Sequence, residues 1–142
     1  MELGSEAGMR KLILITCLFL STSCSYGAKF IDQAGKRPAY GDYNTFTKNI
    51  TVTLPSGERF KGRYFPLDAN ELGSRQGSLF SRVDISTYLG LTGLAEGWKD
   101  WHAFLKGDRG ATLEVIFRYN SSQNHGYGAA RTDNGAEYRV TL

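Results

Sequence analysis

The chain has 142 residues, of which 17 are Lys or Arg and 14 are Asp or Glu, giving a formal net charge of +3. This length fits a single domain with one hydrophobic core. No basic run is longer than two residues, as at Lys36-Arg37. Because nucleic-acid binding usually requires a clustered basic surface, we expect no nucleic-acid partner.

The N-terminal segment has the pattern of a secretory signal peptide. Arg10 and Lys11 precede an almost wholly apolar run over residues 12–20, and small polar residues follow. These features are typical of a signal peptide, which we predict over residues 9–23. As a helix, the apolar run would be only about 14 Å long, too short to cross a bilayer. Residues 1–8 are acidic and do not suit a signal peptide, so we interpret them as a misassigned or non-native extension.

The residues that lead into Cys24 resemble the lipobox of bacterial lipoproteins. Ser23 supplies the small residue before the cysteine, whereas Ser21 stands where a leucine is usual. The resemblance implies that Cys24 is acylated and becomes the first residue of the mature chain, and two or more acyl chains give stable membrane attachment. Ser25 after the cysteine is usual for outer-membrane sorting. We therefore expect a lipid-anchored protein of the bacterial cell envelope, at the outer membrane and facing the periplasm, with cleavage as an ordinary secreted protein as the alternative.

Cys24 is the one cysteine that remains after processing, because Cys17 lies within the part to be removed. The mature domain is therefore expected to have no disulfide, no cysteine metal ligand and no cysteine nucleophile. Residues 24–45 show no sustained periodicity, and we predict a lipidated tether there. A flexible coil of about twenty residues spans roughly 25 Å. The β-domain is then expected over residues 46–142.

Alternating hydrophobicity from residue 46 onward predicts half-buried strands. The clearest are at residues 49–54, 58–65, 111–120, 126–132 and 136–142. Turn sequences rich in glycine separate them, and Asn134-Gly135 predicts a type I′ hairpin turn. Residues 54–65 and 131–142 also share a turn glycine with an aromatic residue three positions later, which we attribute to similar hairpins.

The segment from 66 to 100 gives a weaker signal. We read residues 77–90 as a strand through Val83 and Ile85, because five glycines between residues 73 and 97 disfavour a long helix.

Residues 98–105 fit two structures. Trp98, Trp101 and Leu105 have the spacing of a short helix, but a hairpin turn follows them, so we favour a strand. About six or seven short strands then predict an all-β fold, a small antiparallel β-barrel or sandwich.

The sequence contains no recognisable catalytic or metal-binding motif. His102 and His125 lack the spacing of a metal site and the partners for nucleophilic catalysis, so we expect no metal, no cofactor and no enzyme activity. A periplasmic hydrolase or metal-dependent enzyme is the rival interpretation. Aromatic residues exceed what one small core needs, and Trp and Tyr suit binding surfaces. The candidate binding surface consists of Trp98, Trp101, His102, His125 and Tyr127, with core packing as the alternative for the aromatic rings.

Several stretches together resemble a family of small uncharacterised bacterial lipoproteins. They are Cys24, LPSGERFKG (54–62), FLKGDRGATLEVIF (104–117) and GYGAARTDNGAEYRVTL (126–142). This resemblance implies a topology and a location in the cell envelope, and it implies no established activity.

The NGAEY segment (134–138) is also similar to the SGAxY segment of periplasmic lysozyme inhibitors, which are lipid-anchored β-barrels. The disulfide cysteines typical of those inhibitors are absent here. We therefore predict a lipoprotein whose non-catalytic β-domain binds a protein or another envelope component. An inhibitor of lysozyme type is the alternative.

Overall fold

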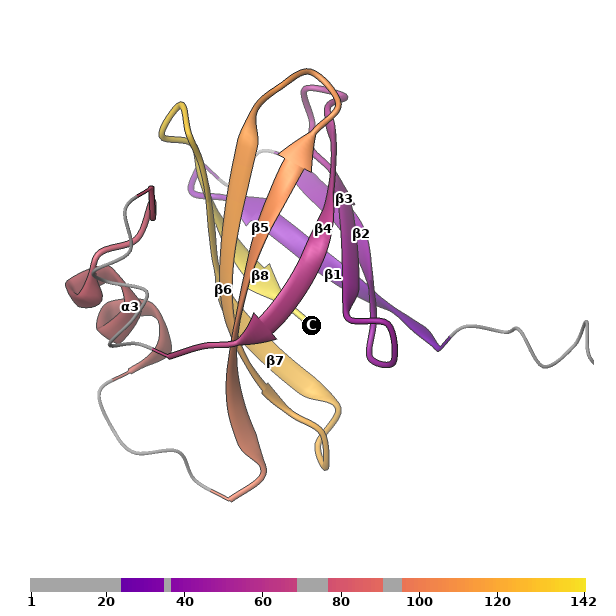
Figure 1. Cartoon of the computed structure of the whole chain (residues 1–142), viewed down its shortest axis with the longest axis vertical. Helices are drawn as coiled ribbons and strands as arrows, with labels where there is room; N and C mark the ends of the chain where they lie inside the picture. Colours follow the sequence, from indigo (N-terminus) through magenta and orange to yellow (C-terminus); the bar gives the residue numbers. More distant parts are fainter. Residues whose placement is uncertain (1–23, 35–36, 69–76, 91–95) are drawn as a thin grey trace, which may run out of the picture.

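Eight antiparallel strands close into a barrel (Figure 1). The computed structural model describes residues 24–34, 37–68, 77–90 and 96–142. Within these ranges the strands pair in chain order, and β8 pairs with β1 to close the sheet. The strands are β1 (Ser25–Asp32), β2 (Pro38–Asn44), β3 (Asn49–Thr53), β4 (Arg59–Pro66), β5 (Trp98–Gly107), β6 (Thr112–Asn120), β7 (His125–Thr132) and β8 (Glu137–Thr141). The predicted small antiparallel all-β barrel is confirmed, with eight strands in place of the six or seven expected.

Alternate residues of each strand point into the barrel and form its core. In β6, Leu113, Val115 and Phe117 are buried inside, as their period-2 spacing predicted. Phe30 of β1 and Phe60 of β4 are also almost wholly buried. Because the interior of an eight-stranded barrel is only just wide enough to be filled by side chains, residues of this size occupy much of it.

The strand favoured for residues 98–105 is confirmed. β5 covers these residues and lies between β4 and β6 in the sheet. The hairpin turn that favoured this interpretation joins β5 to β6, where the Gly107 N–H donates to the carbonyl of Ala111 at 2.8 Å.

Three hairpin turns share one backbone conformation. Gly57, Gly110 and Gly135 have positive φ angles of 84°, 98° and 90°. Each donates its N–H to the carbonyl three residues earlier, at N···O distances of 2.9, 3.1 and 2.9 Å. This is the three-residue hairpin loop, in which a type I turn is followed by a left-handed residue. The type I′ turn predicted at Asn134-Gly135 is therefore wrong, because that turn needs positive φ at both residues and Asn134 does not have it.

A further glycine allows β7 to approach β6 inside the barrel. A Cβ atom on Gly128 would lie 2.0 Å from the carbonyl oxygen of Ile116 and 2.6 Å from the Cα atom of Phe117. Both distances are far below van der Waals contact, so the observed backbone admits only glycine at this position.

The tether predicted over residues 24–45 is wrong, because most of this segment forms two strands of the barrel. β1 pairs with β2 and β8, and β2 pairs with β3. Phe30 of β1 and Tyr43 of β2 are buried in the core, which explains aromatic residues that a linker does not need. Among the described residues, the first strand begins at Ser25, directly after Cys24.

The strand predicted within residues 77–90 is also wrong, because Arg82–Leu89 form the helix α3. The Asp84 N–H donates to the Ser81 Oγ at 3.1 Å, and the Ser81 N–H donates to the Asp84 Oδ2 at 2.9 Å. This reciprocal pair is a capping box, which starts the helix. Gly90 then ends it.

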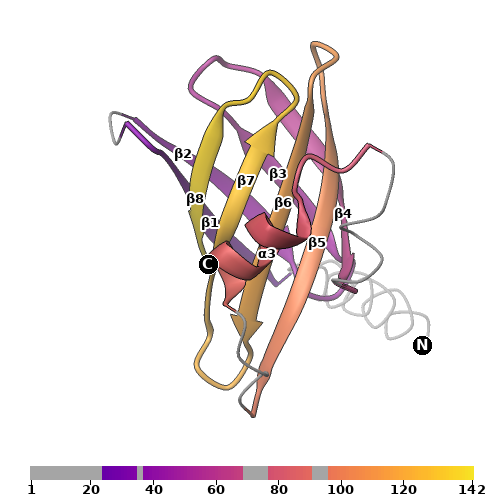
Figure 2. The same ribbon diagram turned by 90° about the vertical axis from the view of Figure 1, so that its left-hand side faces the viewer.

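Helix α3 lies across the outside of the barrel, over β6 and β7 (Figure 2). Ile85 and Leu89 of the helix, with Phe80 before it, form one side of a small second core. The other side consists of Ile116 of β6 and Ala129 of β7, which point outward from the barrel. The segment therefore covers an apolar part of the barrel wall that would otherwise face water.

The signal peptide predicted over residues 9–23 and the extension over 1–8 lie outside the described residues. In the ranges that the structure describes, no helix is both long and apolar enough to span a bilayer.

Candidate functional site

The two ends of the barrel carry different connections between the strands. Because the strands alternate in direction, the turns after β1, β3, β5 and β7 lie at one end. The loops after β2, β4 and β6 lie at the other end, together with the start of β1 and the end of β8 (Figure 1). We call this second end the mouth. Cys24 is exposed and precedes β1, so it lies at the mouth.

A cavity of about 230 Å³ lies at the mouth, and half of the residues that line it are aromatic. Tyr64 contacts Trp101 and Phe117 edge-to-face, with ring centroids 5.3 and 5.4 Å apart. Tyr43 and Tyr119 make a similar contact at 6.0 Å. The cavity is lined by Tyr43, Thr45, Lys48, Tyr64, Gly97, Lys99, Trp101, Phe117, Tyr119 and Ser121. A concave wall of this kind, with a few polar groups, is typical of a small-ligand site.

Lys48 carries a positive charge to this wall. Its Nζ is 5.0 Å from the centre of the Trp101 ring and 5.5 Å from that of Tyr64, within cation–π range. Its backbone is left-handed, with a φ of 61°. The Lys48 N–H donates to the Asn44 carbonyl at 2.9 Å, and the Lys48 carbonyl accepts from the Tyr64 N–H at 2.9 Å. Two hydrogen bonds therefore hold an uncommon backbone conformation and fix where this side chain begins.

The charge of the cavity is positive. Lys99 joins Lys48 in the lining, and no Asp or Glu is among the described residues that form the wall. Charges of one sign at a concave surface with low-dielectric walls concentrate the electrostatic potential, so this lining favours an anion over a cation.

Two tyrosines of the wall, Tyr43 and Tyr64, have raised pKa values. Burial, and after it hydrogen bonding to Tyr119, raises the pKa of Tyr43 well above its usual value. Burial also raises the pKa of Tyr64. The Tyr64 hydroxyl donates to the Asn44 carbonyl at 3.1 Å, and that of Tyr119 donates to the Asn124 Oδ1 at 2.6 Å. The hydroxyls of Tyr43 and Tyr64 are therefore not poised to exchange protons near neutral pH.

Trp98, His125 and Tyr127 form a cluster on the outside of the barrel. The Trp98 ring lies 6.3 Å from the His125 ring and 5.7 Å from the Tyr127 ring. Close by on the same face, the guanidinium of Arg118 donates to both carboxylate oxygens of Asp100, at 2.7 and 3.0 Å. Hydrogen bonding to Asp100 raises the pKa of Arg118. In the aromatic cluster beside this ion pair, His125 is exposed, whereas Trp98 and Tyr127 are half-buried.

The five residues of the predicted binding surface thus occupy three different places. Trp98, His125 and Tyr127 are together on the outer wall, whereas Trp101 lines the mouth cavity. His102 is buried, with 6% of its surface exposed, and packs edge-on against Phe104. The alternation that placed Trp101 and His102 in one strand also places them on opposite faces of it.

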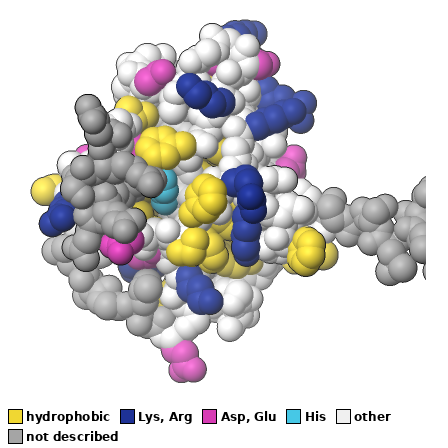
Figure 3. All heavy atoms as spheres, in the orientation of Figure 1, with side chains coloured by type: hydrophobic (Ala, Val, Ile, Leu, Met, Phe, Trp, Pro, Cys, Tyr) yellow, Lys and Arg dark blue, Asp and Glu magenta, His cyan; other side chains and the backbone are white. Residues whose placement is uncertain are grey.

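Other exposed hydrophobic residues lie near the mouth. Phe46, in the loop after β2, is 91% exposed, and Phe65, near the end of β4, is 53% exposed. The Arg63 guanidinium lies 6.0 Å from the centre of the Phe65 ring. On the face drawn in Figure 3, hydrophobic side chains lie beside Lys and Arg side chains. Such a surface suits a partner that is partly apolar and partly anionic.

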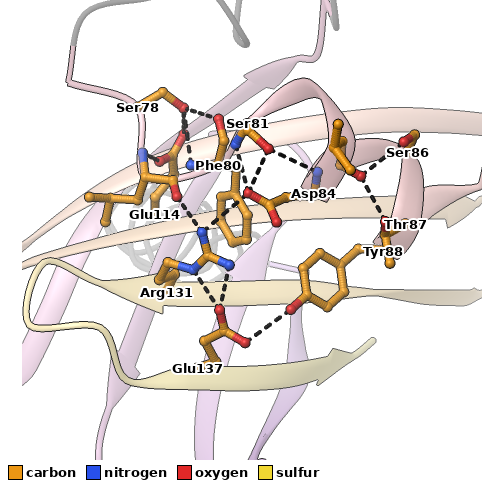
Figure 4. Close-up of polar contacts among 12 residues, drawn as sticks. Ser78, Phe80, Ser81, Asp84, Ser86, Thr87, Tyr88, Glu114, Arg131 and Glu137 are labelled. Atoms are coloured by element: carbon orange, nitrogen blue, oxygen red, sulfur yellow. Dashed lines mark hydrogen bonds and ion pairs between the residues drawn. The ribbon is translucent and has the colours of Figure 1, made fainter.

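Glu114 is fully buried, although it points outward from β6. The Ser78 Oγ donates to its Oε1 at 3.0 Å, and the Leu79 N–H donates to its Oε2 (Figure 4). The His102 Nε2 lies 3.5 Å from Oε1 and has no hydrogen-bond partner among the described residues. The carboxylate therefore attaches the segment that leads into α3 to the barrel wall.

Arg131 and Glu137 complete this attachment from β7 and β8. Arg131 donates to the Leu79 carbonyl at 2.5 Å and to the Asp84 Oδ2 at 3.3 Å, and it also donates to Glu137. The Tyr88 hydroxyl donates to the Glu137 Oε2 at 3.0 Å (Figure 4). We call Glu114, Arg131 and Glu137 the polar clip. It links the segment containing α3 to three strands of the barrel.

The sequence interpretation missed the polar clip and the role of Lys48. Glu114 alternates with core residues and was expected to face water, because the segment that covers it was read as a strand. Lys48 lies between two strands in a loop without glycine, and no pattern in the chain indicates its left-handed backbone.

The described residues offer no metal site and no shared histidine site. No three His, Cys, Asp or Glu side chains within these ranges are grouped so that they could hold a metal ion. His102 pairs with Ile116, and His125 pairs with Asn120 four residues further along β6. At 3.3 Å per residue the two histidines are roughly 13 Å apart along the sheet, too far to act on one substrate atom.

Neither a family model, nor a curated protein, nor a solved structure matches this chain. The functional conclusions below therefore rest on the geometry of the chain itself.

Proposed function

We propose that this chain is a lipid-anchored protein of the bacterial cell envelope, with a non-catalytic β-domain that binds a protein or another envelope component. The observation that carries the proposal is the position of Cys24. This cysteine is exposed, follows the predicted signal segment and directly precedes the first strand of a closed barrel. Cleavage before Cys24 would leave the whole barrel intact and place the acyl chains at its N-terminus.

The anchor would hold the domain close to the membrane. A twenty-residue tether would have given a reach of roughly 25 Å. Instead, β1 begins at Ser25, whose register partner in β2 is Asn44. The mouth would therefore lie near the lipid headgroups, most simply on the periplasmic face of the outer membrane, as the residue after Cys24 favours.

A binding role without catalysis fits the arrangement of the reactive groups. The two histidines are far apart along the sheet, and the hydroxyls of Tyr43 and Tyr64 in the cavity keep their protons. The outer cluster of Trp98, His125 and Tyr127 presents aromatic residues of the kind enriched in protein interfaces. We propose this cluster as the contact surface for the partner.

The intact mass of the protein from the membrane fraction of a bacterial host tests the anchor. We expect a chain that begins at Cys24 and carries added acyl mass, and we expect the Cys24→Ala variant to lack that mass. Cys17→Ala is the matched control, because Cys17 lies within the segment to be removed, and it should leave the modification unchanged. An unacylated polypeptide cleaved at another bond would overturn the proposal and indicate a secreted protein.

Inhibition of lysozyme is the second candidate function. The NGAEY segment starts in the β7–β8 turn, where residues 133–135 are exposed at the end of a hairpin. The Asn134 Oδ1 accepts a hydrogen bond from the Ala136 N–H at 3.2 Å, so this side chain supports the turn itself. A turbidity assay of bacterial cell walls with lysozyme and excess protein decides this candidate. Unchanged lysis would exclude it.

A further inference from the structure

We propose that the mouth cavity is a binding site for a small organic anion that carries a single ring. The proposal goes beyond the anchored binding protein described above and does not depend on acylation of Cys24. It rests on the size of the cavity, the chemistry of its wall and the position of Lys48.

The size limits the ligand to about one ring. The cavity has a volume of about 230 Å³. Pockets for drug-sized ligands are larger, at about 300–1,000 Å³. Below the cavity, fully buried side chains such as Phe30 and Leu105 occupy the barrel interior, so a longer ligand cannot extend inward without displacing the core.

The wall favours a ring as the body of the ligand. Tyr43, Tyr64, Trp101, Phe117 and Tyr119 contribute five aromatic rings to the lining. They are braced by edge-to-face contacts with one another and, at Tyr64 and Tyr119, by hydrogen bonds from the hydroxyls. A rigid aromatic wall stacks against flat rings at a small entropic cost, because its side chains are already ordered.

The charge of the lining requires an anion. Lys48 and Lys99 are the charged residues among the described lining residues. The Lys48 Nζ lies against the Trp101 and Tyr64 rings, where a cation would be repelled and an anionic group could pair with it directly. A lysine ammonium is a compact point charge without the planar fork of arginine, so it accepts a carboxylate or a phosphate equally well.

The backbone of Lys48 gives independent support. Its φ of 61° is a conformation that glycine and asparagine adopt more readily than lysine. The other described residue of this kind is Asn124, with a φ of 47°, where the residue type suits the backbone. Lysine at a position that disfavours it indicates that its side chain is needed, because strained residues cluster at ligand sites.

Calorimetric titration of the purified chain with two matched pairs of probes tests the proposal. Benzoate with benzyl alcohol tests an aromatic ring, and glucuronate with glucose tests a sugar ring. We expect the anion of at least one pair to bind at least about tenfold more tightly than its neutral partner, the ratio given by one charge-assisted hydrogen bond. The pair that responds identifies the type of ring. Amide NMR shifts should locate the bound anion at Lys48, Lys99 and Trp101.

Lys48→Gly is the critical variant, because glycine suits the left-handed backbone and the barrel should remain folded. It should weaken binding of the anion about tenfold or more and leave the neutral probe unaffected. Lys106→Met is the matched control, since Lys106 is exposed at the opposite end of β5 and should not affect binding.

Three results would overturn the proposal. The first is that neither anion binds at concentrations up to about 10 mM, which is the weakest affinity expected for probes of this size. The second is that the anionic and neutral probes bind equally well. The third is that Lys48→Gly binds the anion as tightly as the native chain does. None of these results bears on the acyl mass at Cys24, so the two proposals fail separately.

Discussion

Replacing Glu114 with Gln removes the charge of the most deeply buried carboxylate in the described chain while keeping its shape. Glu114 accepts one hydrogen bond from the Ser78 hydroxyl and one from the Leu79 N–H. The amide of Gln offers one oxygen, which can still accept from the Leu79 N–H, and its NH₂ group can donate to the Ser78 Oγ, whose own proton can turn to the Phe80 carbonyl. The substitution therefore replaces two hydrogen bonds to a charged acceptor with hydrogen bonds between neutral groups.

The magnitude follows from these two contacts. A hydrogen bond to a charged group contributes about 1.5–3 kcal/mol, whereas one between neutral groups contributes about 0.5–1.5 kcal/mol, so each of the two bonds loses about 1 kcal/mol. Removing a buried charge offsets part of this loss, because the carboxylate no longer has to be desolvated. We therefore expect Glu114→Gln to lower the free energy of unfolding by about 2 kcal/mol.

Urea unfolding followed by circular dichroism measures the global effect, and native-state hydrogen exchange measures the local one. The amides of Ile85 and Leu89 in α3 should exchange faster in the variant, because the clip holds the segment that leads into the helix. Glu96→Gln is the matched control, since Glu96 is exposed, and it should change stability by less than about 0.5 kcal/mol. If Glu114→Gln behaves like this control in both measurements, the assignment of Glu114 to the clip is refuted.

Three further substitutions test the fold. Gly128→Ala should destabilise the barrel by about 1–3 kcal/mol or more in urea unfolding, because the added Cβ atom would overlap the backbone of β6. Gly27→Ala is the control and should have little effect, because the space around Gly27 is open. Ser81→Ala should cost about 1 kcal/mol through loss of the helix cap, and equal stability of the two proteins would contradict the capping box. The pKa of Asp84 is lowered, because hydrogen bonding from the Ser81 backbone, together with Arg131, outweighs the effect of burial. The ionised carboxylate therefore stabilises the fold at pH values above its unfolded pKa. This stabilisation is lost as the pH falls through the folded pKa. Asp84→Asn should therefore differ from the native chain most near neutral pH and progressively less below about pH 4, and a stability difference independent of pH would count against the ion pair with Arg131.

The strands that were predictable are those with strong alternation on the core face. In β6, large apolar residues occupy every inward position, so sequence alone identifies the face. β1 and β2 follow the same alternation, but their inward positions include Ala28, Ala39 and Gly41. Small residues carry little hydrophobic signal, and this is why a tether was expected where the barrel has two strands.

Alternation also cannot tell what covers the outward face of a strand. Glu114 and Ile116 both point away from the barrel core, and both are fully buried, because the segment containing α3 packs over them. That segment was read as a strand from its apolar residues, although Ser81 and Asp84 have the spacing of a capping box. The helix-start signal was present, and the glycines on either side concealed it.

The residues of the candidate binding surface could not be assigned to the inner or outer face of the barrel from the sequence. Trp98, Trp101 and Tyr127 were grouped by composition, which contains no information about which side of the wall each side chain occupies. The register of β5 puts Trp101 inside the barrel with Tyr64, and Trp98 outside with Tyr127. Tyr43 joins the cavity from a segment that was expected to be a linker. A site assembled from four strands and the loops beside them becomes visible only when the barrel is closed.

Cys24, the proposed site of the anchor, lies at the same end of the barrel as the cavity, and this constrains how the two could work together. Ser25, the residue after Cys24, is already in register with Asn44 at the end of β2, so an acylated Cys24 leaves no flexible spacer. The loop after β2 carries the exposed Phe46 and, two residues later, Lys48 of the cavity wall. Aromatic and basic side chains are both favoured at a membrane interface, so the same loop can face the headgroups and border the cavity. In an anchored protein, an anion would then reach Lys48 from the layer of solvent next to the membrane. The outer cluster of Trp98, His125 and Tyr127 lies at the same end, because Trp98 begins β5 and His125 begins β7, so a partner would contact it close to the membrane surface.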